Sequence, residues 1–392
     1  MSFDLHEVQD DLRAAKLDGW LFYDFRGRDP IAQRILTLPP GMRTRRWFYF
    51  VPAKGEPRKL VHKIESESLA AVPGDTLYYA GQEELRKNLA KTLGRAKTVA
   101  MQYSPKAAIP YVAMVDAGTV ELVRAAGVKV VSSADLVQKY EACWTLEQLE
   151  SHLTAGKAID RIVQGALQQA ATRVRAKEDF TEYDLQQWIL QEFESAGIGQ
   201  EQGPDVAVNA NASDPHYGPV AGKSSPIRKG DLLLLDVWGK TKTPGSVYYD
   251  ITWIGYLGEK VPAKYAKVFG IARDARDRAV NLIQSCIAAG KPLQGWQVDK
   301  AARSVIENAG YGKYFFHRTG HSIGETVHGN GANMDGLETH DVRHLIPKTC
   351  TSVEPGIYLP EFGIRTELNV YIGEREARVT GAVQNEILPL LA

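Results

Sequence analysis

The sequence predicts a two-domain protein, with an α/β domain over residues 1–140 and a larger α+β domain over residues 141–392. The chain has 392 residues, which is more than one compact core usually holds. Its first third alternates strand-like and helix-like segments, as α/β domains do. In the remainder, a long helix, a shorter helix and two apolar strands follow one another twice.

The overall composition excludes several classes of protein. Lys plus Arg and Asp plus Glu each total 47, and this zero net charge argues against nucleic-acid binding, which usually needs a basic excess. No apolar run is long enough to cross a bilayer, and the first residues lack the pattern of a signal peptide. The three cysteines have no metal-type spacing and suit a reducing compartment, so we expect a cytoplasmic protein.

The elements of the first domain follow from hydrophobic periodicity. Strand-like runs lie at residues 18–25, 45–53, 59–65, 98–105 and 128–137. Apolar residues recur at helical spacing over residues 83–93, which predicts a helix there. We therefore expect a small domain with a sheet and covering helices.

Each half of the second domain begins with a helix pair. The four helices are expected at residues 146–174, 181–197, 263–290 and 295–310. Thr181 is a suitable N-cap for the second helix, and Gly197 is a suitable residue for its C-terminal end. The similar sequences ESAG and ENAG close the two shorter helices, which supports a duplication.

Each half then continues with a histidine-containing loop and two strands that carry one acid each. The corresponding residues are His216 and His328, Asp236 and Glu354, and Asp250 and Glu367. The two members of each pair are separated by a nearly constant number of residues. We therefore expect a duplicated unit that closes around one site, with a pseudo-two-fold axis between its halves.

Acids inside apolar strands need a compensating partner. Asp236 ends a run of four leucines, and Asp250 lies within VYYDITWIGY. An unpaired buried carboxylate is unstable unless it is protonated, hydrogen-bonded or bound to a cation. Four carboxylates with one imidazole suit Mn²⁺, Co²⁺, Zn²⁺ or Fe²⁺, and His321, between the glycines of HRTGHSIG, is the best imidazole.

Structural roles for the same residues are real alternatives. An Asp that ends a strand is more often a cap or a turn former than a ligand. Glu354 in VEPG could start a turn, and Glu367 could pair with Arg365. His321 alone would be structural as often as it is a ligand. These alternatives weaken together, because five potential ligands recur in one symmetric framework.

Several motifs resemble those of the pita-bread metallopeptidases, the group of methionine aminopeptidase, aminopeptidase P and prolidase. The motifs are PHY, LLDVWG, YYDIT, HRTGHSIG, SVEPGIY and GIRTEL, and they span the second domain. The first domain resembles the N-terminal α/β domain of the prolidase, aminopeptidase P and creatinase branch. The resemblance implies a pita-bread catalytic domain that holds two divalent ions (Mn²⁺, Zn²⁺ or Co²⁺).

The resemblance also implies roles for single residues. The implied metal ligands are Asp236, Asp250, His321, Glu354 and Glu367. The resemblance implies that Asp250 and Glu367 bridge the two ions. It also implies that Glu354 takes a proton from a water molecule shared by the ions, which leaves a hydroxide as the nucleophile. His216 and His328 would steady the substrate and the developing negative charge.

The proline-specific branch is the better match. His317 and Arg365 correspond to positions that this branch uses near the imide substrate and its carboxylate, although each could equally be a structural support. The resemblance implies a cytoplasmic homodimer that acts on Xaa-Pro dipeptides as a prolidase. The alternatives are an aminopeptidase P, which acts on longer Xaa-Pro peptides, and a non-catalytic pseudo-peptidase, which the intact ligand set disfavours.

Three features depart from the family pattern. The segments 240–249 and 329–341 are longer than usual, and both would lie near the substrate entrance. Leu368 replaces the usual acidic or amide residue after Glu367, which changes how that carboxylate is oriented. None of these departures removes an implied ligand.

Overall fold

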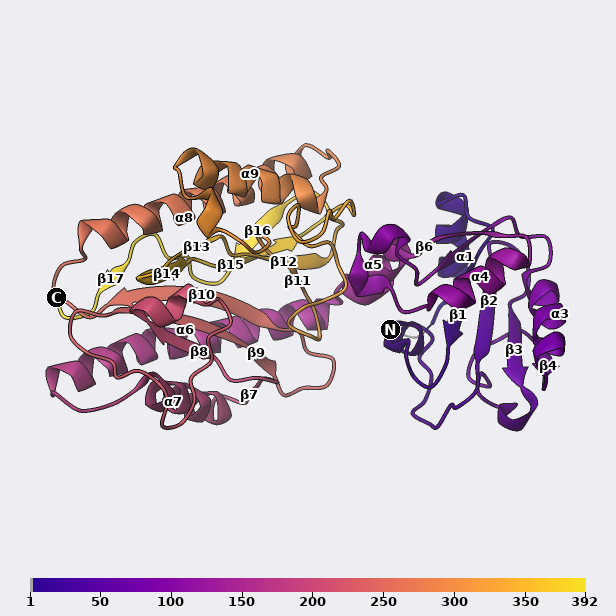
Figure 1. Cartoon of the computed structure of the whole chain (residues 1–392), viewed down its shortest axis with the longest axis horizontal. Helices are drawn as coiled ribbons and strands as arrows, with labels where there is room; N and C mark the ends of the chain where they lie inside the picture. Colours follow the sequence, from indigo (N-terminus) through magenta and orange to yellow (C-terminus); the bar gives the residue numbers. More distant parts are fainter. Residues whose placement is uncertain (1–2) are drawn as a thin grey trace. The chain divides into compact units, whose positions relative to one another are not determined.

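The computed structural model describes residues 3–392 and divides into two compact units (Figure 1). The first unit extends to Glu141, and the second runs from Ala142 to Ala392. The boundary expected from the sequence, after residue 140, lies one residue before this division.

A six-stranded sheet forms the N-terminal unit, in the order β4-β3-β2-β1-β5-β6. Its strands are β1 (Gly19–Asp24), β2 (Trp47–Pro52), β3 (Arg58–His62), β4 (Asp75–Tyr79), β5 (Thr98–Met101) and β6 (Lys129–Ser132). Strand β2 is antiparallel to β1 and β3, whereas the other neighbouring strands are parallel. Every residue of β1 and β2 is buried, which accounts for their nearly continuous apolar character.

Helices cover both faces of this sheet. Helices α1 (Leu5–Ala14), α2 (Pro30–Ile35) and α5 (Ala134–Ala142) pack on one face, and α3 (Gln82–Leu93) and α4 (Ala117–Ala125) pack on the other. The strand predicted over residues 128–137 is too long, because β6 ends at Ser132 and α5 begins at Ala134. The Ser132 hydroxyl group accepts a hydrogen bond from the Ala134 N–H, which favours a helix start at this point.

Two helix pairs enclose the strands of the C-terminal unit (Figure 1). The first half contributes α6 (Leu146–Arg175), α7 (Glu182–Ser195), β9 (Leu232–Thr241) and β10 (Tyr249–Tyr256). The second half contributes α8 (Ala263–Ala288), α9 (Gly295–Asn308), β12 (Thr349–Val353) and β15 (Leu368–Ile372). The repeated order agrees with the expected plan. The cap at Thr181 is confirmed, because its side chain accepts a hydrogen bond from the Asp184 N–H.

The four-leucine run of β9 is buried on both faces, as its composition predicted. Leu232 and Leu234 belong to the apolar cluster that contains α8 and α9, whereas Leu233 and Leu235 pack with α6 and α7. The strand therefore lies between the two helix pairs, and its alternate residues face opposite halves.

Shorter elements complete the described chain. They are β7 (Ile198–Gly199), β8 (Asp205–Val208), β11 (Ser322–Ile323), β13 (Gly356–Leu359), β14 (Phe362–Arg365), β16 (Ala377–Thr380), β17 (Leu388–Pro389) and the 3₁₀ turns η1 (Lys63–Glu65), η2 (Pro105–Ala107), η3 (Pro110–Val112), η4 (Asn209–Ser213) and η5 (Gly312–Tyr314). Strands β12 and β15 pair with each other, and along the chain the hairpin of β13 and β14 lies between them. The continuous strands expected around Glu354 and Glu367 are thus interrupted, and Pro355, which has no N–H, explains the first break.

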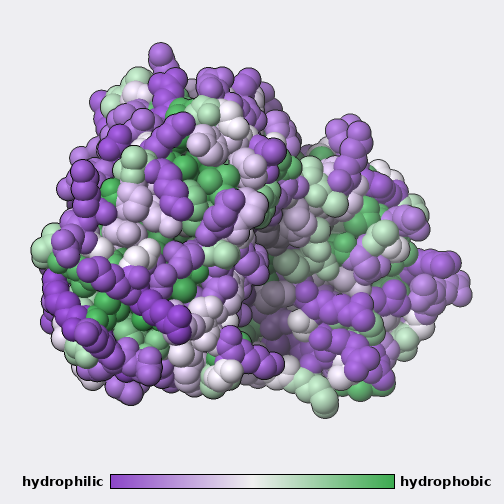
Figure 2. Space-filling model, turned by 60° about the vertical axis from the view of Figure 1, so that its left-hand side comes forward, coloured by the Kyte–Doolittle hydropathy of each residue, from purple (hydrophilic) through white to green (hydrophobic). Residues whose placement is uncertain are grey.

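The surface mixes polar and apolar residues. Figure 2 shows hydrophilic residues spread over the visible face, with hydrophobic residues in patches between them. Within residues 3–392, no helix combines the length and apolar character that crossing a membrane requires.

Candidate metal centre

Strands β9 and β10 present Asp236 and Asp250 on one face of their ladder. Asp236 lies directly opposite Thr252, and Asp250 precedes Thr252 by two residues, so all three side chains share a face. Leu232 and Leu234 occupy the same face of β9 and pack with the second half of the unit. The two acids therefore point toward that second half.

The second half supplies Glu354 and Glu367 at the ends of two paired strands. Val353, the last residue of β12, lies opposite Leu368, the first residue of β15. Glu354 follows Val353 and Glu367 precedes Leu368, so the antiparallel register continues with the two acids opposite each other. The N–H of Glu367 also donates to the Thr252 carbonyl oxygen at 3.4 Å, which connects this position to β10.

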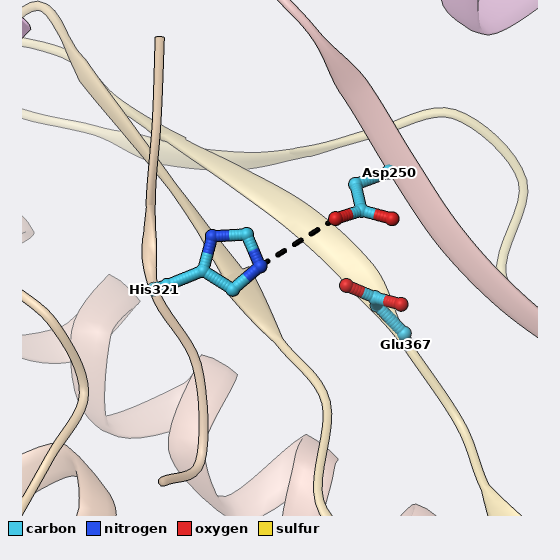
Figure 3. A group of neighbouring side chains, drawn as sticks. All are labelled: Asp250, His321 and Glu367. Carbon is cyan, nitrogen blue, oxygen red and sulfur yellow. Dashed lines mark ion pairs between the residues drawn. The ribbon is translucent and has the colours of Figure 1, made fainter. Parts of the chain in front are cut away.

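His321 is fixed by contacts to its backbone and its ring. Its N–H donates to the Ser352 hydroxyl group at 2.9 Å. Its ring Nδ1 lies 3.1 Å from the Ser322 carbonyl oxygen, which can only accept, so Nδ1 carries the proton and Nε2 has a free lone pair. This Nε2 lies 3.5 Å from Asp250 Oδ2 (Figure 3) and 3.5 Å from Glu354 Oε1. A lone pair that faces two carboxylates is an arrangement that a cation stabilises.

Asp250, His321 and Glu367 form the centre of the cluster (Figure 3). All three are buried, and their ligand atoms lie within 4.8 Å of one another. Asp250 Oδ1 and Glu367 Oε1 are buried and find no hydrogen-bond partner among residues 3–392. Burial and the charge of Asp236 raise the pKa of Asp250 well above its ordinary value, and burial and the charge of Asp250 do the same for Glu367. A divalent cation would satisfy both oxygens and offset the repulsion, so these residues fit a metal centre.

Asp236 is linked to this centre through Thr252, and it also faces Arg365. The buried Arg365 guanidinium group forms an ion pair with Asp236 and donates from Nε to the Thr252 hydroxyl group at 3.0 Å. The Thr252 hydroxyl group lies 2.8 Å from Glu367 Oε2 and 3.2 Å from Asp236 Oδ1. The sequence left two roles open for Arg365, namely contact with the substrate carboxylate and structural pairing with an acid. In the structure Arg365 pairs with an acid, and that acid is Asp236 rather than Glu367.

His317 is connected to Arg365 through Tyr358. The His317 Nδ1 donates to the Arg318 carbonyl oxygen at 2.6 Å, and Nε2 accepts from the Tyr358 hydroxyl group at 2.7 Å. Arg365 Nη1 donates to the same hydroxyl oxygen at 3.1 Å. Burial and the charge of Arg365 lower the pKa of His317 to about 3, so the imidazole is neutral. Both residues predicted to contact substrate therefore belong to one polar chain.

The two loop histidines have different surroundings. The His328 ring packs edge to face against the His321 ring, with ring centroids 4.4 Å apart. The His216 side chain is exposed, and its backbone N–H donates to Asp214 Oδ1 at 3.0 Å in a local turn. The structure thus brings His328 against the cluster and leaves His216 on the loop before β9.

Three polar residues of this region were not foreseen from the sequence. Thr252 and Tyr358 lie inside motifs that carried the resemblance, and the position of Thr252 two residues after Asp250 was a usable signal. Asp205 lies opposite Asp236 on β8, and burial with the charge of Asp236 raises its pKa to about 8. No sequence signal identifies Asp205, because its position depends on the pairing of β8 with β9.

The two strand pairs with their acids and imidazole, enclosed by two helix pairs, define a metallopeptidase of the pita-bread architecture. The chain belongs to metallopeptidase family M24, which it matches over residues 154–374, more than half of its length.

Curated proteins and solved structures agree with this membership. The chain is 29% identical over 272 residues to the protein described as "Probable dipeptidase PepE" of Mycobacterium tuberculosis. The aligned region covers 68% of this chain and 66% of that protein, so the chain spans just under two thirds of the relative's length. It is 33% identical over 165 residues to an Xaa-Pro dipeptidase of Lactobacillus helveticus, or 41% of this chain and 40% of the relative. The crystal structure of dipeptidase PepE from Mycobacterium ulcerans superposes with a TM-score of 0.70 at 24% identity, over 98% of this chain and 96% of the other, which shows the shared fold.

Proposed function

We propose that this chain is a metal-dependent peptidase that hydrolyses the imide bond of Xaa-Pro dipeptides. The observation that carries the proposal is the pair of orphaned buried oxygens, Asp250 Oδ1 and Glu367 Oε1, beside the free lone pair of His321. Membership of family M24 supports peptidase chemistry. Relatives described as Xaa-Pro dipeptidases support the choice of substrate.

Five side chains would hold two divalent ions. They are Asp236, Asp250, His321, Glu354 and Glu367, two from the first half of the unit and three from the second. Asp250 and Glu367 would bridge the ions, because each has one oxygen without a protein partner. Bound divalent ions would polarise the scissile carbonyl group and lower the pKa of a water molecule.

Glu354 is the proposed proton acceptor. Ser352 donates a hydrogen bond to its Oε1 at 3.2 Å, and its side chain keeps partial exposure, so it can reach a substrate. Burial raises the pKa of Glu354, and the His321 ring opposes that shift. A carboxyl group with a raised pKa can take a proton from water and return it to the leaving proline nitrogen.

His328 and His216 are proposed to stabilise the substrate carbonyl oxygen as it gains negative charge. The contact of the His328 ring with His321 supports this role, because it places an imidazole directly beside the cluster. Burial lowers the pKa of His328, and the charge of His216 adds to this shift, which supports a shared role for the two rings.

Arg365 and His317 are proposed to recognise the proline end of the substrate. A guanidinium group can bind the free carboxylate of a dipeptide with two hydrogen bonds. In this structure the group is paired with Asp236. As a metal ligand, Asp236 would no longer need Arg365 as its counter-charge, so the guanidinium group would become available.

An aminopeptidase P that acts on longer Xaa-Pro peptides is the second candidate. The observation that favours it is the full set of protein partners of Arg365, namely Asp236, Thr252 and Tyr358. If Arg365 keeps these partners, its guanidinium group does not distinguish a free carboxylate at proline from a continuing chain.

The proposal extends to the ions and the surroundings of the protein. We propose Mn²⁺, Zn²⁺ or Co²⁺ as the ions, because all three accept mixed carboxylate and imidazole ligands. We also propose a homodimer in the cytoplasm. The three cysteines, Cys143, Cys286 and Cys350, are free thiols, which is consistent with a reducing compartment.

A paired assay tests the proposal. Hydrolysis of an Xaa-Pro dipeptide is compared with that of the matched Xaa-Pro-Yaa tripeptide, with each of the three ions and after chelation, on protein whose metal content is measured. Metal-dependent cleavage of the dipeptide with little cleavage of the tripeptide would support the prolidase. Preference for the tripeptide would support aminopeptidase P. Bound metal without either cleavage would refute the proline specificity, and absence of metal binding would refute the metal centre.

A further inference from the structure

The N-terminal unit contains a cavity of about 1070 Å³ that the proposed peptidase chemistry does not use. All of its lining residues belong to the N-terminal unit, and none of the proposed metal ligands is among them. Its volume is close to the upper limit of the range for pockets that bind small organic molecules. It therefore needs its own explanation.

The cavity lies at the edge of the sheet where ligands of open α/β folds bind. Tyr23, His62 and Tyr79 line it from the last residues of the mutually parallel strands β1, β3 and β4. Arg46 precedes the antiparallel strand β2, so it reaches the same edge. In open sheets, the crevice beyond the carboxyl ends of parallel strands is the usual ligand position.

Two helices form the walls of this cavity. From α3, Gln82, Arg86 and Ala90 line it at intervals of four residues, which places them on one face of the helix. From α4, the wall begins at Asp116 and Gly118, at the helix N-terminus. Both helices pack on the same face of the sheet, so the cavity is the space between them at that edge.

The cavity is rich in guanidinium groups. The four arginines that line it are Arg28, Arg45, Arg46 and Arg86. Within residues 3–392, none of the four forms an ion pair with a carboxylate. Four like charges around one space repel one another, and an anion between them would remove that repulsion.

The known side-chain contacts of these arginines are to neutral groups. Arg46 donates to Gln82 Oε1 at 3.0 Å, and Arg45 donates to the hydroxyl group of its neighbour Thr44 at 2.8 Å. The guanidinium group of Arg28 lies 5.5 Å from the centroid of the Phe25 ring. Glu65, which lies outside the cavity lining, accepts a hydrogen bond from the Arg45 N–H and compensates part of the Arg45 charge. Arg28, Arg46 and Arg86 have no carboxylate partner of this kind among residues 3–392.

Two acids also line the cavity, and they do not cancel this charge. The Asp116 carboxylate caps α4, because it accepts hydrogen bonds from the Thr119 N–H at 2.9 Å and the Thr119 hydroxyl group at 2.8 Å. Glu121 is an exposed residue of α4, where water screens its charge. The four arginines outnumber these two acids.

We propose that this cavity binds a small organic molecule that carries a diphosphate or a longer phosphate chain. Guanidinium groups bind phosphate oxygens with paired hydrogen bonds, and several of them suit a multiply charged group better than one carboxylate. Tyr23, Phe25 and Tyr79 supply aromatic surface for the organic part. This site is distinct from the proposed peptidase centre and does not depend on it.

Calorimetric titration of the metal-loaded full chain with pyrophosphate, ADP and adenosine at 0.15 M salt tests the proposal. We expect ADP to bind at least as tightly as pyrophosphate, and adenosine not to bind. Arg86→Gln and Arg28→Gln should each weaken ADP binding by about tenfold or more, as expected for a lost charge-assisted hydrogen bond. Lys87→Gln is the matched control, because it removes an exposed charge next to Arg86 on α3 and outside the cavity lining.

Two results would overturn this site. One is that neither pyrophosphate nor ADP binds to the wild-type chain. The other is that both variants bind ADP as the wild type and Lys87→Gln do, which would locate the anion elsewhere, for example at the metal ions. Because all forms keep the same metal centre, only the difference between variants is interpreted.

Discussion

Arg365 and Asp236 form an ion pair that joins the two halves of the C-terminal unit. Asp236 lies on β9 in the first half, and Arg365 ends β14 in the second. Both side chains are largely buried, with exposed fractions of 4% for Arg365 and 15% for Asp236. The charge of one proposed metal ligand is therefore already compensated by a residue proposed to bind substrate.

Arg365→Ala separates the two roles of this arginine. If the guanidinium group binds the substrate carboxylate, kcat/KM should fall by roughly tenfold to a hundredfold for an Xaa-Pro dipeptide. The matched tripeptide, whose proline carboxylate is not free, should be affected much less. Arg375→Ala, at an exposed position in the turn before β16, is the control. An equal loss on both substrates would mean that Arg365 acts only through Asp236.

Glu367→Gln should have opposite effects on activity and on the stability of the metal-free protein. A neutral amide cannot bridge two cations, so we expect less bound metal and a loss of activity beyond about a hundredfold. In the chelated protein the same change removes repulsion with Asp250 and should raise the free energy of unfolding by roughly 1–3 kcal/mol. Elemental analysis, kinetics and chemical denaturation with chelator measure the three effects.

Glu361→Gln is the matched control for this change. Glu361 is an exposed carboxylate in the turn of the β13/β14 hairpin, so its replacement should alter neither metal content nor stability. Full metal content and full activity in Glu367→Gln would contradict its assignment as a ligand.

Thr252→Val tests the hydroxyl group that contacts Arg365, Asp236 and Glu367. Valine keeps the branched shape but leaves the Glu367 carboxylate without its 2.8 Å donor. We expect metal affinity to fall by about tenfold to a hundredfold, as for other groups that orient metal ligands. Thr252→Ser keeps the hydroxyl group and should bind metal as the wild type does. If Val and Ser behave alike, the effect is one of packing and not of orientation.

His152 should make the C-terminal unit sensitive to acid. Its ring is buried between the Tyr248 carbonyl oxygen, 2.6 Å from Nδ1, and the Thr380 hydroxyl group, 2.7 Å from Nε2. Burial lowers the pKa of His152 from 6.5 to about 4. The unfolded chain therefore binds this proton first as pH falls, and stability decreases between pH 6.5 and 4.

The pKa shift of His152 sets the expected size of this loss of stability. The lowered pKa corresponds to roughly 3 kcal/mol of unfolding free energy, measured by denaturation of chelated protein across that pH range. His152→Gln should flatten the dependence, whereas replacement of the exposed His6 should leave it unchanged. A pH profile identical in wild type and His152→Gln would rule out this histidine as the cause.

The sequence identified the groups of the site better than their contacts. Asp236 and Asp250 were recognisable because acids interrupt apolar strands, and His321 because glycines flank it. The pairing of Arg365 with Asp236 was not recognisable, because it joins strands that are 129 positions apart. A pattern along one strand indicates which face a residue occupies, but not which residue of another strand meets it.

The errors in the predicted elements have a similar origin. The segment at residues 128–137 has apolar residues that fit a strand or a helix. The Ser132 hydroxyl group accepts a hydrogen bond from the Ala134 N–H at the point where the strand gives way to the helix. Strand β12 ends just before Glu354 and β15 begins just after Glu367, because the β13/β14 hairpin is inserted between them along the chain. The effect of this hairpin on the neighbouring strands depends on the whole fold.

The alternation of side chains between the two faces of β9 limits which changes its sequence can accept. The even-numbered positions from Leu232 to Asp236 face the second half of the unit, and the odd-numbered ones face α6 and α7. Leucines on either face can be exchanged for other apolar residues at modest cost. Deletion or insertion of a single residue before Asp236, however, would turn its carboxylate into the apolar cluster of the first half. The composition of the strand can therefore vary, but its length before Asp236 cannot change by a single residue.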